Sequence, residues 1–511
     1  MRPSERGNAD FSSGPRNAVI DIGSNTVRMV IYGGAARAPA VLWNEKVTAR
    51  LGRDMAATGR LSDEAMATAL AGLARFAALL AMQGITDVET VATAAVRDAE
   101  NGAQFLEQVR ATGLMPRLLT GIEEAIIGAQ GVLGAFPAAN GVVADLGGGS
   151  LELTRIADRA CSEGISLPLG TLRLESLRAA GPDVFAQEVG RLLHNTPWPQ
   201  SQATGKAVHD LYMVGGTSRS VAIYGLRNAK SALDDPHGLS LNGADAAALM
   251  AAISSKTREQ LAKVSGIASM RAAVLPDAAA LLDLLIAHIR PARVIFSAWG
   301  LREGLLMRRM EPVALMQDPL LAGVAAYAAP RGGRPELAAR IAGWTADARP
   351  AQGQGEERLR LAATMLALAS MQIEPNLRVA HGLNWALHKR WINLDASGRA
   401  MLAAALCGNT GATSAPGELA GLADPEQLRE AICWGLAIRL FRRIGANALD
   451  SLNTTRLRAQ DGRLELRFSA HSAVLRNRGV EKDLDKLADQ LGMEPAIIIM
   501  PDARLSDDGP G

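Results

Sequence analysis

Two short stretches of the chain repeat one device, in which a hydrophobic strand ends in an Asp and is followed by a glycine-containing turn and a second strand. The first stretch covers residues 18–32 and the second covers residues 141–154, so the copies lie about 120 residues apart. Turns of small residues expose backbone N–H groups that can face phosphate oxygens, and a carboxylate at the strand end can hold a divalent cation. The repeat therefore predicts two lobes that face one phosphate.

The pairing of the two copies matters more than either copy alone, because most glycine-rich hairpin turns bind nothing. Strands and helices alternate after each copy, a pattern that predicts a duplicated α/β fold with a cleft between its halves. This pattern resembles the superfamily of actin, the sugar kinases and the chaperone ATPases. The resemblance implies an actin-like fold of two lobes.

Seven motifs narrow this resemblance, and together they cover roughly residues 17–312. In chain order they are Asp21-Ile-Gly-Ser-Asn-Thr-Val-Arg28, Ala92-Thr-Ala-Ala-Val-Arg-Asp-Ala-Glu-Asn101, Gly121-Ile-Glu-Glu-Ala125, Asp145-Leu-Gly-Gly-Gly-Ser-Leu-Glu152, Ser166-Leu-Pro-Leu-Gly170, Gly215-Gly-Thr217 and Trp299-Gly-Leu-Arg-Glu-Gly304. In this order the motifs resemble those of the exopolyphosphatase and guanosine pentaphosphate phosphohydrolase (Ppx/GppA) family, and the chain is most similar to the exopolyphosphatases.

Hydrolysis of a phosphoanhydride needs a group that takes a proton from the attacking water. Thr120 and Glu123 fit a capping box, in which the Thr side chain caps a helix and the Glu side chain bonds back to the cap N–H. Glu124 lies about 100° further round that helix, so it can point into the cleft. We expect Glu124 to be the general base, and the resemblance agrees, since the family's catalytic glutamate directly precedes the small residue that is Ala125 here.

Asp145 and Glu152 flank the second glycine turn on adjacent strands of a hairpin, where both can face one Mg²⁺, directly or through water. The family resemblance also implies a catalytic role for both residues. Asp21 occupies the corresponding position in the first repeat, which predicts a third metal ligand. An Asp before a tight turn also commonly forms an Asx turn, so both interpretations of Asp21 stay open.

The phosphate oxygens need N–H groups or cations around them. We expect these contacts from the glycine turns, namely from Gly23, Ser24, Asn25, Gly147, Gly148, Gly149, Ser150, Gly215, Gly216 and Thr217. Arg97 is expected to add a bidentate cation. The alternatives are ordinary ones: the Gly215-Gly216 pair can simply turn a strand, and Arg97 can simply form a surface ion pair.

The chain is too long for one hydrophobic core, and shifts in its composition mark five segments. We predict a disordered tail (1–16), an N-terminal lobe (17–140), a second lobe (141–312), a connecting segment (313–358) and a C-terminal region (359–511) that is helical and ends in a small α/β unit. Longer family members carry a C-terminal region similar to metal-dependent HD phosphohydrolases. The corresponding stretch here, residues 365–370, lacks the His and acidic pair, so we expect a degenerate version.

The charges nearly balance, with 54 Lys plus Arg against 52 Asp plus Glu, so any attraction for an anionic substrate must come from local patches. One such segment holds nine arginines: Arg439, Arg442, Arg443, Arg456, Arg458, Arg463, Arg467, Arg476 and Arg478. A phosphate polymer can lie along such a segment because each neutralised phosphate releases counterions. A solvated or dimer-facing surface is the competing interpretation.

The three cysteines lie far apart, which argues against a disulfide framework or a zinc site. No run approaches the ~18 apolar residues of a membrane span, and no signal peptide is recognisable. We therefore expect a cytoplasmic protein.

The function that fits these motifs best is a Mg²⁺-dependent exopolyphosphatase that releases terminal orthophosphate from inorganic polyphosphate. Guanosine pentaphosphate hydrolysis is the close alternative, and a non-catalytic sensor of nucleotide or polyphosphate is an alternative of another class. The resemblance further implies a homodimer, and nothing in the sequence indicates a nucleic-acid partner.

Overall fold

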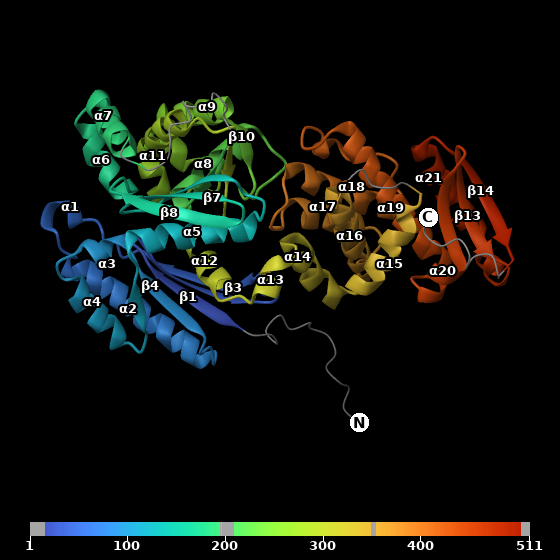
Figure 1. Ribbon diagram of the computed structural model, residues 1–511, viewed down its shortest axis with the longest axis horizontal. Coiled ribbons are helices and arrows are strands. Elements are labelled where there is room, and N and C mark those ends of the chain that lie inside the picture. Colours follow the sequence, from blue (N-terminus) through green and yellow to red (C-terminus); the bar gives the residue numbers. More distant parts are fainter. Residues whose placement is uncertain (1–15, 195, 197–208, 349–353, 502–511) are drawn as a thin grey trace. The chain divides into compact units, whose positions relative to one another are not determined.

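The computed structural model describes residues 16–194, 196, 209–348 and 354–501. The chain divides into two compact units, Met1–Pro319 and Leu320–Gly511 (Figure 1). The predicted N-terminal tail lies outside the described residues except for Arg16, whose guanidinium donates to the side chain and the carbonyl of Gln83.

The first sheet of unit 1 has five strands in the order β3-β2-β1-β4-β5. They are β1 (Asn17–Ile22), β2 (Val27–Gly33), β3 (Ala40–Val47), β4 (Val88–Ala92) and β5 (Pro116–Leu118), accompanied by α1 (Met55–Thr58), α2 (Asp63–Met82), α3 (Ala94–Asp98) and α4 (Gly102–Arg110). Apolar residues at helical spacing put Leu73 and Phe76 of α2 on one face, and both are fully buried in the core beneath the sheet.

The second sheet has six strands in the order β10-β11-β9-β6-β7-β8. Its strands are β6 (Gly141–Leu146), β7 (Leu151–Ala157), β8 (Ala160–Leu167), β9 (Asp210–Val214), β10 (Ser240–Asn242) and β11 (Arg293–Phe296). Its helices are α5 (Gly121–Ala135), α6 (Thr171–Ala179), α7 (Pro182–His194), α8 (Gly216–Asn228), α9 (Gly243–Ser254), α10 (Arg258–Ala262), α11 (Ser269–Ile289), α12 (Leu301–Arg308) and α13 (Pro312–Met316).

The two sheets repeat one topology. In each, a central strand (β1 or β6) pairs antiparallel with the next strand in the chain and parallel with a later one (β4 or β9). The register places Asp21 opposite Arg28 in the first hairpin and Asp145 opposite Glu152 in the second. The predicted duplicated, actin-like α/β fold is therefore confirmed.

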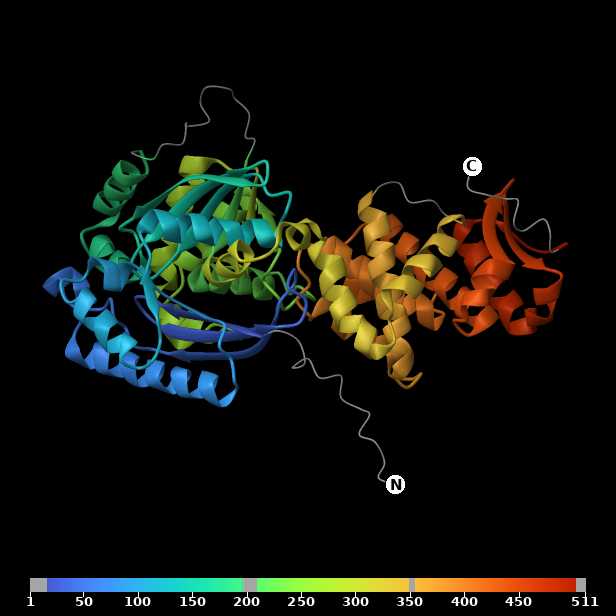
Figure 2. The same ribbon diagram turned by 60° about the horizontal axis from the view of Figure 1, so that its bottom comes forward.

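Helices α5 and α12 pack closely against each other, and α5 also lies on β7 and β8 (Figure 2). Glycines permit this approach: a Cβ on Gly131 would lie 2.1 Å from the carbonyl oxygen of Gly300, and one on Gly304 would lie 1.8 Å from that of Ile127. Any larger residue at either position would push the two helices apart.

Two helices of unit 1, α2 and α11, are long and apolar enough to pass a length and hydropathy test for membrane spans. Both have a buried face, which includes Leu73 and Phe76 of α2 and Leu281, Leu282 and Leu285 of α11. They therefore serve as the core helices of the two lobes.

Unit 2 is a helical region that ends in a small three-stranded sheet of order β12-β13-β14. Its helices are α14 (Pro319–Ala328), α15 (Pro335–Ala346), α16 (Gln354–Ala369), α17 (Arg378–Leu387), α18 (Ala396–Thr410), α19 (Pro425–Gly445), α20 (Leu449–Thr454) and α21 (Arg478–Leu491). Its strands are β12 (Thr455–Gln460), β13 (Arg463–Ser469) and β14 (Glu494–Met500). The predicted helical region with a terminal α/β unit is confirmed.

The hairpin between β12 and β13 turns at Asp461 and Gly462, which have φ angles of 52° and 74°. Two successive left-handed residues match the twist of the flanking strands, as the Asp-Gly pair predicts. The described residues of the predicted connecting segment, 313–348 and 354–358, contain most of α13, all of α14 and α15, and the start of α16. Two prolines of this segment, Pro319 and Pro335, each begin a helix.

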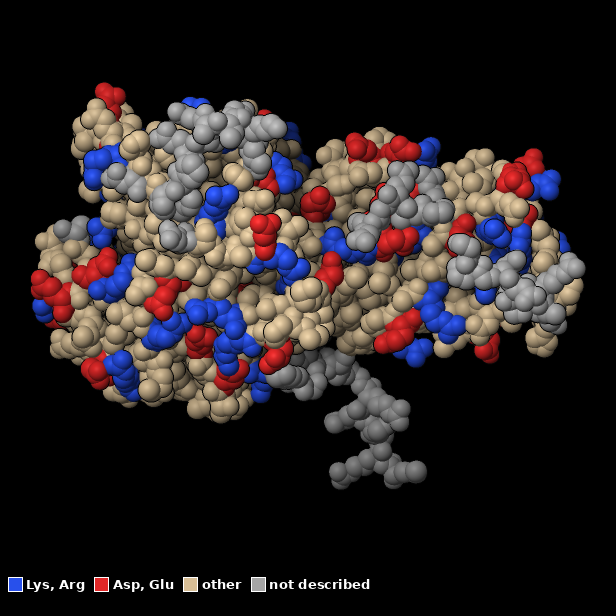
Figure 3. Space-filling view, viewed as in Figure 1, with Lys and Arg blue, Asp and Glu red and all other residues tan. Residues whose placement is uncertain are grey.

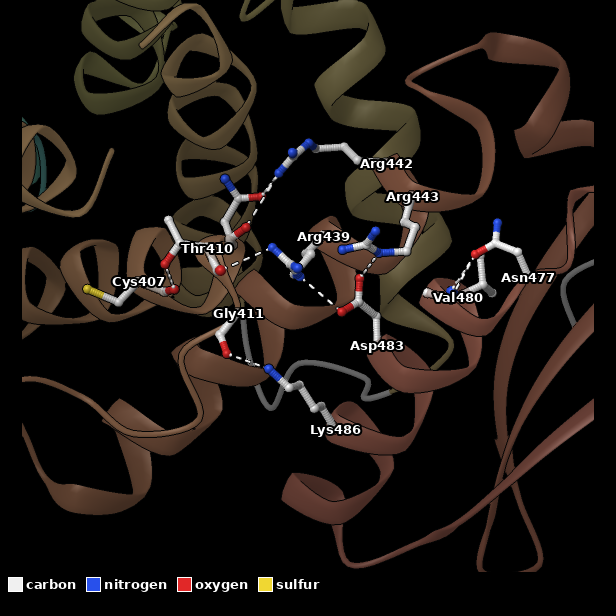
Figure 4. Close-up of polar contacts among 12 residues, drawn as sticks. Cys407, Thr410, Gly411, Arg439, Arg442, Arg443, Asn477, Val480, Asp483 and Lys486 are labelled. Atoms are coloured by element: carbon white, nitrogen blue, oxygen red, sulfur yellow. Dashed lines mark hydrogen bonds and ion pairs between the residues drawn. The ribbon is translucent and has the colours of Figure 1, made fainter. Parts of the chain in front are cut away.

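Most arginines of the basic segment are occupied by neighbours inside unit 2. Figure 4 shows Arg439 and Arg443 directed at Asp483, and Arg442 directed at residue 409. Further partners are the Leu452 carbonyl for Arg456, Glu494 for Arg463, Glu465 for Arg467 and Glu481 for Arg476. These contacts favour a structural role for most of the segment. Binding of a phosphate polymer along it stays a prediction, because most of its guanidinium groups already have partners within unit 2.

Lys and Arg side chains alternate with Asp and Glu over the face of each unit in Figure 3. This mixture agrees with the nearly balanced charge of the sequence.

Candidate active site

The two glycine turns meet across a cleft in unit 1. A Cβ built on Gly148 would lie 3.2 Å from the Cβ of Ser24, and one on Gly149 would lie 2.8 Å from its Oγ. The second turn therefore needs glycine at these positions so that its backbone can approach the first. The resulting cavity has a volume of about 150 Å³.

In the first turn, neighbouring residues bind the carbonyl groups and leave amides free. Gly52 donates its N–H to the Ser24 carbonyl at 2.7 Å, and Arg50 donates to the Asn25 carbonyl at 3.0 Å. Among the described residues, no acceptor bonds the amide N–H groups of Ser24 and Asn25. This arrangement is suited to an anion, because both residues line the cavity and their amides have no competing carbonyl partner.

The second turn is held in the same way. Thr171 donates to the Gly147 carbonyl at 3.1 Å, and Leu172 donates to the Gly148 carbonyl at 2.9 Å. Within the described chain the amides of Gly148 and Gly149 have no acceptor. The cavity thus receives N–H groups from both lobes.

Glu124 lies in the first turn of α5 and lines the cavity. Arg97 donates to its carboxylate at 3.2 Å. Burial raises the pKa of Glu124 well above the ordinary glutamate value, and the nearby Glu152 raises this pKa further, while Arg97 opposes the shift. A carboxyl with a raised pKa is suited to proton transfer near neutral pH.

Glu123 is engaged at the end of the helix. Its carboxylate accepts from the Thr120 N–H at 2.8 Å, and the Glu123 N–H donates to the Thr120 hydroxyl at 3.2 Å. The predicted capping box is confirmed, and it leaves Glu124 as the glutamate of this pair that faces the cavity.

Asp145 and Glu152 lie opposite each other on β6 and β7, and both line the cavity. Burial and then Asp21 raise the pKa of Asp145 to about 6. Burial and then Asp145 raise the pKa of Glu152 to about 7, although Ser166 donates to the Glu152 carboxylate at 2.8 Å. Asp21 thus raises the pKa of Asp145, and Asp145 raises that of Glu152, so bound positive charge would be stabilising among these three carboxyl groups.

This donor set fits a hard divalent cation, since Asp21, Asp145 and Glu152 supply oxygen ligands only. In the described part of the chain, no group of three or more His, Cys, Asp or Glu side chains is close enough to hold an ion by itself. Mg²⁺ usually keeps several waters and takes further ligands from substrate phosphates, so an incomplete protein shell is consistent with it.

A sequence profile of the Ppx/GppA phosphatase family matches residues 30–312, which is more than half of the chain. The chain belongs to the Ppx/GppA phosphatase family. The matched range contains the second glycine turn, Glu124 and most of both lobes, and it begins within β2, just after the first glycine turn.

This Ppx/GppA family member is 28% identical over 314 residues to a protein named Exopolyphosphatase 1 from Mycobacterium leprae (strain TN), an alignment that covers 58% of this chain and 91% of the relative. It is also 28% identical over 292 residues to Exopolyphosphatase 2 from Mycobacterium tuberculosis (strain ATCC 25618 / H37Rv), covering 54% of this chain and 91% of the relative. A crystal structure of an exopolyphosphatase from Cytophaga hutchinsonii ATCC 33406 matches with a TM-score of 0.52 and 21% identity, over 58% of this chain and 99% of that one. The structural match shows a shared fold.

The structure brings most of the predicted site residues of this Ppx/GppA phosphatase to one cavity. Those that line it are Asp21, Gly23, Ser24, Asn25, Glu124, Asp145, Gly147, Gly148, Gly149, Ser150, Glu152, Gly215 and Gly216. Arg97 is not among the lining residues, and it contacts Glu124 instead. Thr217 is fully buried, and its hydroxyl accepts from Arg271 at 2.9 Å, so its side chain positions an arginine rather than facing the cavity.

Sequence reasoning missed four arginines that line the cavity: Arg28, Arg219, Arg271 and Arg302. Arg28 and Arg302 lie inside recognised motifs, and the strand register of a hairpin would have placed Arg28 opposite Asp21. Arg302 lies 3.8 Å from the Asp21 carboxylate. Arg271 lies in the first turn of α11, a core helix, and carried no local signal.

A buried glutamate, Glu303, was missed as well. It accepts from the Tyr32 hydroxyl at 2.7 Å and from the Gly300 N–H at 3.0 Å. These bonds join β2 of one lobe to the start of α12 beside the other sheet, so Glu303 helps to hold the cleft together.

Proposed function

We propose that this cleft hydrolyses the terminal phosphoanhydride bond of inorganic polyphosphate and releases orthophosphate. The observation that carries the proposal is the joint arrangement of free turn amides from both lobes with Glu124, a buried carboxyl of raised pKa, at one side of the same cavity. The names of the aligned relatives support the choice of polyphosphate as the substrate.

Glu124 acts as the general base in this mechanism. Its carboxylate takes the proton from the attacking water, and Arg97 favours the ionised form that can accept it. The turn amides and the lining arginines stabilise the charge on the transferred phosphoryl oxygens, and their positions are fixed before the substrate arrives.

Asp21, Asp145 and Glu152, which all line the cavity, would hold Mg²⁺. When bound, the cation would neutralise charge on the phosphates. The effects of Asp21 on the pKa of Asp145 and of Asp145 on the pKa of Glu152 support this assignment, because a cation relieves the repulsion between carboxylates.

Guanosine pentaphosphate hydrolysis uses the same chemistry on a shorter anion and is the second candidate. Orthophosphate release from polyphosphate, guanosine pentaphosphate and ATP, each assayed with Mg²⁺ and without other nucleotides, separates the possibilities. Release from polyphosphate with the highest kcat/KM supports the proposal. A preference for guanosine pentaphosphate supports the second candidate, and binding of either anion without hydrolysis would establish a sensor.

The proposal also includes a homodimer, which the family resemblance implies, and the cytoplasmic location expected from the cysteine pattern and the other features of the sequence. Sedimentation of the full-length protein tests the dimer, and fractionation of the producing cells tests the compartment.

A further inference from the structure

A second cavity lies at the opposite end of the α5 and α12 pair from the cleft. Both helices place residues near their N-termini in the cleft, Glu124 from α5 and Arg302 from α12. Residues near their C-termini, Leu133 and Met307, line the second cavity. The two cavities share no lining residue, so the second one is a separate site.

This second cavity has a volume of about 560 Å³, within the range of small-molecule sites. Its walls come from α5, α12, α13 and two hairpin turns, those between β2 and β3 and between β7 and β8. All of these elements belong to unit 1.

Three arginines line the cavity, Arg37, Arg159 and Arg308. None of the described residues that line it is an Asp or a Glu. The cavity therefore presents positive charge on one side without an acidic residue in its own wall, which favours an anionic head group.

Arg37 is the most buried of these cations, since it is only 2% exposed, whereas Arg159 and Arg308 are exposed. It donates to the carbonyls of Gly134 at 2.8 Å and Gln317 at 3.0 Å, and forms no hydrogen bond to a carboxylate among the described residues. Burial lowers the pKa of Arg37, Asp318 opposes this change, and Arg159 adds to it. A guanidinium has five donors, so the two carbonyls leave donors for an anion.

The rest of the wall is aliphatic. Apart from the polar Gln130, it consists of Leu133, Met307, Met310, Leu315 and Met316, together with two prolines and Gly134. No Phe, Tyr or Trp is among the described lining residues, so the cavity has no ring on which a nucleobase can stack. Flexible methionines adapt well to a flexible alkyl chain.

We propose that this cavity is a binding site for an amphipathic anion, in which Arg37, Arg159 and Arg308 hold a phosphate or carboxylate head group and the Met and Leu side chains enclose an aliphatic chain. The proposed site is independent of the hydrolytic function proposed for the cleft. Its ligand chemistry is that of an alkyl phosphate or a fatty acid.

Titration calorimetry of the full-length protein tests the proposal with ethyl, butyl, hexyl and octyl phosphate. A parallel titration with inorganic phosphate alone measures binding to simple phosphate sites, including the cleft, so that the effect of chain length can be separated from it. We expect each added methylene group to tighten binding about threefold to fourfold until the cavity is filled. Octanoate is expected to bind as well, and it distinguishes a requirement for phosphate from a requirement for any anion.

The charge reversals Arg159→Glu and Arg308→Glu are expected to weaken octyl phosphate binding about tenfold or more each. Both side chains are exposed, so these variants should fold. The matched control is Arg191→Glu on α7, an exposed arginine outside the cavity, which should leave binding unchanged.

Binding that strengthens with chain length and is lost in both cavity variants, but not in the control, supports the site. The proposal is overturned if octyl phosphate does not bind, if chain length has no effect, or if the cavity variants bind as the wild type does. Binding of AMP in place of the alkyl phosphates would also overturn the aliphatic assignment.

Discussion

Replacing Glu152 by Gln is expected to stabilise the protein at alkaline pH, although Glu152 belongs to the proposed catalytic site. Burial and the neighbouring Asp145 raise the pKa of Glu152 from an ordinary 4.5 to about 7. A carboxyl whose pKa is raised on folding holds its proton more tightly in the native state, so folding stability falls as the pH rises from the unfolded pKa to the folded one. A glutamine in the same place has no such penalty.

The size of the effect follows from the two pKa values. The penalty of ionising Glu152 in the folded protein is below about 1 kcal/mol at pH 5 and about 3 kcal/mol at pH 8. The stability difference between Glu152→Gln and the wild type should therefore grow by about 2 kcal/mol between these pH values. For a unit of this size the corresponding shift in Tm is about 3–5 °C.

Side-chain geometry makes the substitution mild. Ser166 donates to the Glu152 carboxylate at 2.8 Å, and the amide oxygen of a glutamine can accept the same bond. Glu64→Gln is the matched control, because the Glu64 side chain is 84% exposed on α2.

Differential scanning calorimetry at pH 5 and pH 8, in buffer with EDTA, measures the difference. Added Mg²⁺ should narrow the gap at pH 8 if the cation binds the ionised Glu152. A stability difference that is the same at both pH values would refute the reasoning, because it would mean that Glu152 ionises normally in the folded protein.

The remaining predictions concern the chemistry of the cleft and the basic segment. Glu124→Gln should lower kcat by ~10²–10⁴ in steady-state phosphate release while polyphosphate binding is retained. Glu123→Gln should mainly lower Tm, because it weakens the helix cap. If Glu123→Gln is instead the inactive variant, Glu123 and not Glu124 is the general base. Arg97→Met removes the cation that favours ionised Glu124, so the acidic limb of the pH profile of kcat/KM should move to higher pH; an unmoved limb would remove Arg97 from this role. Asp145→Asn should raise the Mg²⁺ concentration that gives half-maximal activity, and an unchanged magnesium titration with normal turnover would exclude Asp145 as a ligand. The triple variant Arg456, Arg458, Arg463→Ala should leave kcat/KM and its salt dependence unchanged for long chains if the segment is structural, whereas selective loss on long chains would establish a polymer track.

The sequence by itself determined the duplicated fold and the residues at the strand ends. Two hydrophobic strands end in Asp21 and Asp145, and each continues through a turn of small residues into a second strand. This pattern favours a β-hairpin in both places and fixes its register. The capping box at Thr120 and Glu123 was equally readable, since both partners lie within one helical turn. These features depend on residues close together in the chain.

Tertiary structure alone decided which distant side chains join the site. Arg271 of α11 lines the cleft, whereas Thr217 does not line it and instead accepts a hydrogen bond from Arg271. No sequence pattern near either residue indicates these positions. The raised pKa values of Glu124 and Glu152 have the same origin, because burial and like charges act only after the two lobes pack. Likewise, a count of arginines in the basic segment could not reveal that Asp483, on a helix about forty residues later, would bind both Arg439 and Arg443. Local geometry such as hairpins and helix caps depends on residues close together in the chain, whereas burial and the charge environment depend on contacts between residues far apart in the chain.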